Sequence, residues 1–221
     1  KEYRRQRQMC IRDRAANVSS SVGVLPSYIG GMRSFRHSMA PHSRLIKQLL
    51  IPCFLGVGVG AALLLLGSPS TFRSIVPWLI ALGTLLFALG PWITQRIAHL
   101  GSHGTRRQAL YFGMFLLSIY GGYFGAGLGI LLLALMGLTL SDDIGELQGL
   151  RSVLSTIINA VAALIFLIRG QLVAEAVIML LVGTFLGGLL GTALIKRLSP
   201  TTVRILIVTI GAATALRLWL A

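Results

Sequence analysis

Long apolar stretches without an interior charge constrain this chain more than any other feature. A helix needs about 20 mostly apolar residues to cross roughly 30 Å of hydrocarbon. Stretches that reach or approach this length occur at 48–66, 74–95, 108–140, 152–168, 176–195 and 205–216. The last is short, but Arg217 and Trp219 at its end can reach the membrane interface. Only 12% of the residues are charged, against about a quarter in soluble domains, so the pattern predicts an all-α, polytopic membrane protein.

The basic residues lie between the apolar stretches, not along one face, although the formal net charge is +14. Two basic connections, two spans apart, would lie on one side of the membrane: Arg33, Arg36, Arg44, Lys47, Arg96, Arg106 and Arg107. The positive-inside rule makes that side cytoplasmic. If 108–140 crosses once, the connection with Lys196, Arg197 and Arg204 falls on the opposite side. We expect a multi-pass protein of the cell (cytoplasmic) membrane whose bases meet anionic lipids, not nucleic acid.

Residues 1–14 differ from everything that follows. They are dense in arginine, lack periodicity and start without methionine: KEYRRQRQMCIRDR. A signal peptide would need an apolar central region, which this segment lacks. The run QRQMCIRDR resembles translated sequencing-adaptor read-through. We therefore expect residues 1–14 to be non-native sequence and the native N-terminus to be missing.

An internal repeat divides the chain. Residues 54–73 and 185–204 match at about half of their positions, including the pairs Gly56 and Gly187, Gly60 and Gly191, Ser68 and Ser199, Pro69 and Pro200, and Arg73 and Arg204. Glycines four apart let helix backbones approach closely in lipid, where apolar burial does not drive association. We read 15–100 as an incomplete first transmembrane repeat and 101–221 as the second.

The complete form of this repeat would hold about four transmembrane helices. Because four is even, the two copies are predicted to have the same orientation, as parallel repeats. Two such halves would face each other around a central pathway. This organisation is typical of a transporter.

The glycine-rich segment 121–129, GGYFGAGLG, predicts a break in the helix of the third stretch. Each glycine weakens a helix by up to about 1 kcal/mol relative to alanine. Irregular backbone at membrane depth occurs only inside protein or beside a water-filled cavity, and the half-helix after the break would present free N–H groups to an anion. We take Gly122, Gly125, Gly127 and Gly129 as candidate substrate-binding residues. The alternative is tight helix packing without substrate contact.

A polar face follows on the next helix, where Arg151, Ser155 and Asn159 stand four residues apart. One interpretation is that Ser155 and Asn159 donate hydrogen bonds to an anion that Arg151 attracts. The other is that they only link helices to each other. Asn17 and Ser20 are the equivalent candidates in the first repeat.

Several of these segments together resemble a known family. The order of GGYFGAGLG, LSTIINAVAALIF and GTFLGGLLGTALIKRLSP, followed by TTVRILIV, is similar to the second half of the TauE/SafE family, the sulfite exporter or 4-toluene sulfonate uptake permease family. AANVSSSVGVLPSYIGGMRSFR resembles the second helix of its first half. The resemblance extends from Ala15 to Ala221 and implies a permease for sulfite, sulfonates or related small organic anions. Two positions depart from the family pattern: Ala134 lies where a proline is usual, and Arg151 replaces a common lysine.

Other functions find less support in the sequence. The histidines lie in basic loops without metal-ligand spacing, so we predict no metal and no cofactor. The apolar stretches contain no His, Asp or Glu, which argues against an enzyme with an intramembrane site. A structural or assembly membrane protein without transport activity is the remaining alternative. A homo-oligomer is left open.

Overall fold

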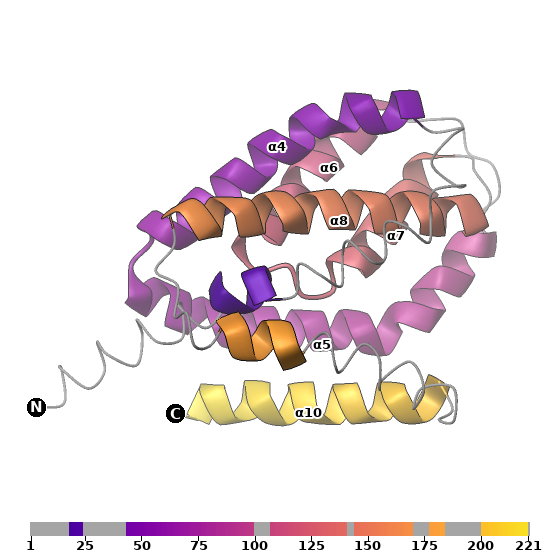
Figure 1. Cartoon of the computed structure of the whole chain (residues 1–221). Helices are drawn as coiled ribbons and strands as arrows, with labels where there is room; N and C mark the ends of the chain where they lie inside the picture. Colours follow the sequence, from indigo (N-terminus) through magenta and orange to yellow (C-terminus); the bar gives the residue numbers. More distant parts are fainter. Residues whose placement is uncertain are drawn as a thin grey trace, which may run out of the picture.

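The computed structural model describes residues 18–23, 43–99, 107–140, 144–169, 177–183 and 200–220. Within these ranges every regular element is a helix (Figure 1). The main helices are α4 (Ser43–Leu66), α5 (Pro69–His99), α6 (Arg107–Tyr123), α7 (Leu128–Thr139), α8 (Ile144–Arg169) and α10 (Pro200–Leu220). Three helical stretches in the described ranges are long and apolar enough to cross a membrane: Ser43–Leu66, Ser70–Ile93 and Glu146–Arg169. This confirms the prediction of a helical membrane protein.

Helices α4 and α6 form the most tightly packed pair, and glycines set their separation. A Cβ on Gly56 would lie 2.5 Å from the carbonyl oxygen of Phe115, and one on Gly122 would lie 2.6 Å from that of Val57. Near the start of both helices, Gln48 Oε1 accepts a hydrogen bond from Arg107 Nη2 at 2.6 Å. Contacts therefore advance in the same order along both helices, so α4 and α6 run parallel.

Helix α5 runs back from α4 through a short turn. Gly67 N–H donates to the carbonyl of Leu63, and the Ser68 hydroxyl accepts from the amide of Thr71 at 3.1 Å. Ser68 thus caps α5, and Pro69 occupies its first position, where no N–H is needed. The repeated Ser-Pro is therefore a helix start.

Helix α7 follows the direction of α5. A Cβ on Gly83 would lie 3.1 Å from Ala126, and one on Gly90 would lie 3.3 Å from Ile130 Cδ1. Since α6 runs parallel to α4 and α7 runs parallel to α5, the chain reverses between α6 and α7. Segment 107–140 therefore enters and leaves at one end of the bundle. This end, called here the basic end, also holds Arg44, Lys47, Arg96 and Arg107.

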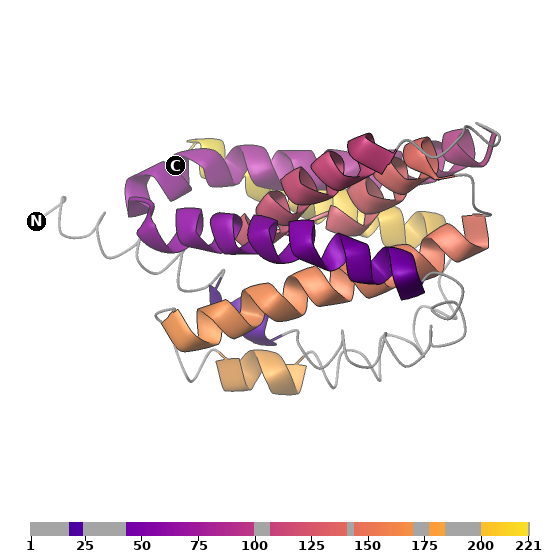
Figure 2. The ribbon, with the colours of Figure 1, turned by 90° about the horizontal axis from the view of Figure 1, so that it is seen from above.

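Helix α10 packs against α5 at the edge of the bundle (Figure 1 and Figure 2). The rings of Trp78 and Trp219 lie 6.0 Å apart, and Thr84 contacts Gly211. Residue numbers increase along α5 where those of the contacting residues on α10 decrease, so the two helices are antiparallel.

These directions bear on two predictions. Because α5 and α10 are antiparallel, α10 begins beside the end of α5 that holds Arg96. The connection before α10, with Lys196 and Arg197, lies outside the described residues, so the side predicted for it stays a prediction. The parallel orientation predicted for the two copies is not found for α5 and α10, which begin at equivalent prolines but run in opposite directions. A segment that re-enters leaves an odd number of crossings, which inverts the next copy.

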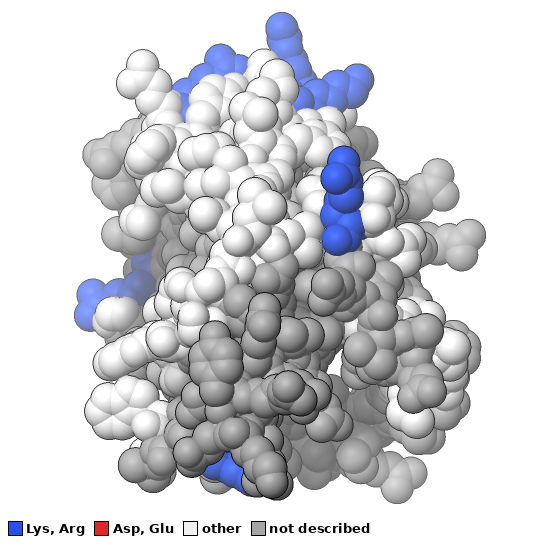
Figure 3. Space-filling model, turned by 90° about the vertical axis from the view of Figure 1, so that its left-hand side faces the viewer, with Lys and Arg blue, Asp and Glu red and all other residues white. Residues whose placement is uncertain are grey.

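Described basic side chains lie at both ends of the bundle. Figure 3 looks at the end where α8 and α10 finish, and it shows scattered basic atoms and no acidic atoms among the described residues. The described side chains near this end include Arg169 and Arg217. The cytoplasmic side of the basic end stays a prediction from the positive-inside rule.

Candidate anion site at the break between α6 and α7

The break is built from two glycines in left-handed backbone conformations. Gly125 has φ 79° and Gly127 has φ 74°, values that L side chains rarely adopt. The carbonyl of Tyr120 closes α6 by accepting from the amides of Phe124 at 2.9 Å and Gly125 at 3.1 Å. The predicted break is therefore confirmed, and two of the four candidate glycines form it.

Helix α7 starts inside the bundle and directs its N-terminus at the break. The amides of Ile130 and Leu131 both donate to the carbonyl of Gly127, at 3.0 and 3.3 Å. Within the part of the chain that the structure describes, no acceptor lies against the amide of Gly129. The amide of Leu128 also donates, to the carbonyl of Gly125 at 3.2 Å, so Gly129 carries the one first-turn amide of α7 without a described backbone acceptor. The helix dipole and this amide favour an anion.

Helix α8 brings its polar face to this break. A Cβ on Gly125 would lie 3.5 Å from Asn159 Oδ1, and a Cβ on Gly129 would lie 3.6 Å from Arg151 Nη1. Arg151 and Asn159 are both half-buried. Four candidates from the sequence, Gly125, Gly129, Arg151 and Asn159, thus lie together at the break, with Gly127 in the same turn.

The amide of Asn159 is engaged within its own helix. Its Nδ2 donates to the carbonyl of Ser155 at 2.7 Å and lies 3.4 Å from the Ser155 hydroxyl oxygen. The side-chain carbonyl of Asn159 is the side-chain atom that a Cβ on Gly125 would approach, at 3.5 Å, after the Gly121 carbonyl oxygen at 3.2 Å. Ser155 and Asn159 thus support the candidate site as a pair, whereas Arg151 and the N-terminus of α7 supply its positive character.

Two of the predicted residues lie elsewhere, and a third is not among the described residues. Gly122 packs against the backbone of α4, which is the alternative interpretation given to the glycines above. Ser20 is half-buried in the helical segment 18–23, whose Gly23 packs against Leu180 of segment 177–183. Asn17 lies outside the described residues.

Two supports of the break were not singled out from the sequence. The Tyr120 hydroxyl donates to the carbonyl of Ala126 and so ties the last turn of α6 to the loop. On α5, a Cβ added to Gly127 would lie 3.3 Å from Leu86 Cδ1, and Gly83 leaves room for Ala126. In the sequence, the spacing of Gly83 and Gly90 on one face of an apolar helix could have indicated that α5 packs closely against another helix. Nothing in the sequence singled out Tyr120.

Two features define the class of protein. One helix of the apolar bundle is broken at its centre, and the N-terminus of the following half-helix lies beside a half-buried arginine. This is a membrane transporter architecture, in which discontinuous helices form the substrate site.

Comparisons with known proteins give the family. The family described as "Sulfite exporter TauE/SafE" matches residues 9–218. The chain belongs to this family. A protein of Haemophilus influenzae named "Probable membrane transporter protein" is 25% identical over 179 residues, which cover 79% of this chain and 68% of that protein. No solved structure matches the chain.

Proposed function

We propose that this chain is a permease for small sulfur-containing or organic anions, such as sulfite or sulfonates, and that the anion passes the break between α6 and α7. Membership of the TauE/SafE family supports transport across a membrane, and the name of the Haemophilus influenzae relative agrees with it. The same family membership favours a transport role over catalysis. The proposed location is the cell (cytoplasmic) membrane, with several crossings.

One observation carries the proposal: Arg151 lies against the first turn of α7. Two sources of positive potential, a guanidinium and a helix N-terminus, converge at Gly129. Glu146 is the one acidic residue in the described ranges, and it lies on the exposed first turn of α8. Charges inside a membrane protein are costly and mark ion or substrate pathways. A small anion that visits the break would meet charge-assisted donors there.

Uptake of ³⁵S-labelled sulfite into proteoliposomes tests this assignment, with a small sulfonate as the second substrate. Arg151→Gln removes the charge but keeps a polar side chain, so flux should fall about 10- to 100-fold, the equivalent of a lost charge-assisted hydrogen bond of about 1.5–3 kcal/mol. Arg169→Gln is the matched control, because it removes an exposed arginine from the far end of the same helix. Its flux should equal that of the unchanged chain.

Two results would count against the proposal. Equal flux in the Arg151→Gln and Arg169→Gln variants would move the pathway away from the break. Folded protein that moves none of the tested anions would favour the structural or assembly role.

A further inference from the structure

Hydrogen-bond donors gather where α4 and α6 begin, at the basic end of the bundle. Arg44 and Lys47 are exposed on the first two turns of α4, and Arg107 is exposed at the start of α6. Residues three and four apart are neighbours on a helix surface, so Arg44 adjoins both Lys47 and Gln48. Neither α4 nor α6 contains an acidic residue. We call Arg44, Lys47, Gln48 and Arg107 the donor cluster.

Gln48 holds the two helices of this cluster together. Its Oε1 accepts a hydrogen bond from Arg107 Nη2 at 2.6 Å and another from the Tyr111 hydroxyl at 3.1 Å. A guanidinium can only donate, so the atom that faces Arg107 is the amide oxygen, and Nε2 adds two N–H donors to the cluster. Guanidinium and ammonium groups have no acceptor either. The chemistry of the donor cluster therefore suits a ligand with several acceptors and a negative charge.

The donor cluster lies at the level where a membrane span begins. Ser43–Leu66 is long and apolar enough to cross a membrane. Ile51 lies one turn after Lys47 on the same surface of α4, and Leu55 lies one turn after Ile51. Their side chains are 68% and 60% exposed. This surface of α4 is thus cationic at its start and apolar directly below, which is the order of headgroup and hydrocarbon in a phospholipid.

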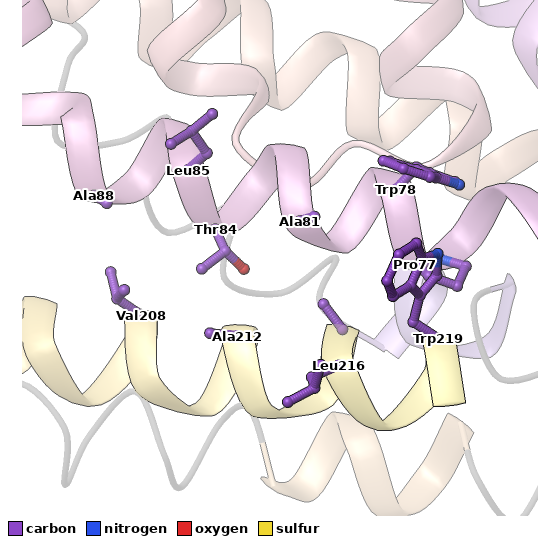
Figure 4. A pocket seen from close by; sticks show the side chains of 11 residues that line it. Pro77, Trp78, Ala81, Thr84, Leu85, Ala88, Val208, Ala212, Leu216 and Trp219 are labelled. Atoms are coloured by element: carbon purple, nitrogen blue, oxygen red, sulfur yellow. The ribbon is translucent and has the colours of Figure 1, made fainter. Parts of the chain in front are cut away.

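The groove between α5 and α10 offers no such combination. It has a volume of about 460 Å³, and small side chains such as Ala81 and Ala212 leave it open (Figure 4). Thr84 supplies the one hydroxyl group among the described side chains that line it, and none of these side chains is charged. A charged headgroup placed there would lose its hydration without gaining a partner, which is strongly unfavourable. Of these two surfaces, the donor cluster is the one suited to an anionic ligand.

We propose that the donor cluster binds the phosphate of an anionic phospholipid, with an acyl chain along Ile51 and Leu55. Arginine forms strong, charge-assisted hydrogen bonds with phosphate, and each nearby cation adds attraction for an anionic lipid. Because Arg44 and Arg107 belong to different helices, the bound headgroup joins the starts of α4 and α6. The site lies at the opposite end of α6 from the break and does not depend on the proposed anion pathway.

Tryptophan quenching by brominated lipids tests the site directly. The reporter is Ile51→Trp in a chain whose three native tryptophans are removed as Trp78→Phe, Trp92→Phe and Trp219→Phe. The protein is reconstituted into phosphatidylcholine vesicles that contain dibrominated phosphatidylglycerol, or dibrominated phosphatidylcholine in its place. Quenching should show about 25-fold stronger binding of phosphatidylglycerol, as expected for two cations near the headgroup at about fivefold each.

Matched variants separate a built site from diffuse attraction. Arg44→Gln and Arg107→Gln should each lower the preference for phosphatidylglycerol about fivefold. Arg169→Gln removes an exposed arginine from the last turn of α8 and should leave the preference unchanged. Gln48→Leu keeps the net charge but removes the acceptor that holds Arg107, so it should also lower the preference.

Three outcomes would overturn the proposal, provided that size-exclusion elution and helical circular dichroism show folded variants. Equal binding of the two lipids would indicate ordinary boundary lipid. A preference that follows charge alone, with Gln48→Leu unchanged, would indicate diffuse attraction to the basic end. Displacement of phosphatidylglycerol by excess inorganic phosphate would show a site for a free anion, whereas a lipid site should keep its lipid.

Discussion

The bundle around the break and the α5–α10 pair are both built from small residues on apolar helices, yet they pack in opposite ways. On α4 and α6 the glycines face the partner's backbone, so that a Cβ on Gly122 would lie 2.6 Å from the carbonyl oxygen of Val57. On α5 and α10 alanines face alanines, and a groove of about 460 Å³ remains. Small residues thus permit close approach, but the partner's surface decides whether backbone or a cavity fills the space.

The polar groups follow the same division. The break collects Arg151, Asn159 and the N-terminus of α7 beside Gly125 and Gly127, whose positive φ values L side chains rarely adopt. Among the described residues, no charged side chain lines the groove. One region is polar and charged inside the bundle, and the other is apolar at its edge.

The largest effect is expected at the α4–α6 contact. Gly56→Ala would put a Cβ 2.5 Å from the carbonyl oxygen of Phe115 and 2.6 Å from Ser118 Cβ, so the helices must separate. We expect a loss of about 2–3 kcal/mol in the free energy of unfolding, measured by denaturant titration in micelles. Gly58→Ala is the control, because its Cβ would meet nothing within 4 Å. A Gly56→Ala protein as stable as Gly58→Ala would refute the close packing.

A smaller effect is expected in the turn itself. Gly127→Ala places a side chain at φ 74°, which costs about 1–2 kcal/mol, and brings Cβ to 3.3 Å from Leu86 Cδ1. Sulfite flux should fall along with the unfolding temperature. Gly183→Ala, a helical glycine with open space around it, should be neutral or more stable. Unchanged flux in Gly127→Ala would separate the turn from the pathway.

The smallest effect concerns the tyrosine that ties the turn. Tyr120→Phe removes the hydrogen bond to the Ala126 carbonyl and should cost about 1 kcal/mol. Tyr111→Phe removes a comparable bond, at 3.1 Å to Gln48 Oε1, away from the break. Both variants should lose similar stability, but only Tyr120→Phe should lower flux. Equal flux in the two would mean that Tyr120 has no role beyond stability.

The sequence predicted the break and the polar face of the helix that follows it, because both depend on local patterns. Five glycines in nine residues weaken a helix wherever it sits, and residues four apart share a helix face in any fold. The direction of the chain after the break was not predictable in this way. It depends on packing of Gly83 against Ala126 and of Gly90 against Ile130, which are distant in sequence.

That reversal explains why α5 and α10 run in opposite directions, whereas parallel copies were predicted. The prediction treated 108–140 as one span. The hydrogen bond from Asn159 to Ser155 was likewise not predictable from the sequence, because residue spacing alone does not say whether a side-chain amide donates within its own helix or to a ligand.

The accessibility of two engineered cysteines tests the central claim, the reversal at the break, most directly. In a Cys10→Ser, Cys53→Ser background, Gln108→Cys lies at the start of α6 and Glu146→Cys at the start of α8, both at exposed positions. A membrane-impermeant maleimide should label both from the same side of sealed vesicles, and Arg217→Cys from the other. Labelling of positions 108 and 146 from opposite sides would show that 107–140 crosses the membrane once and would contradict the account.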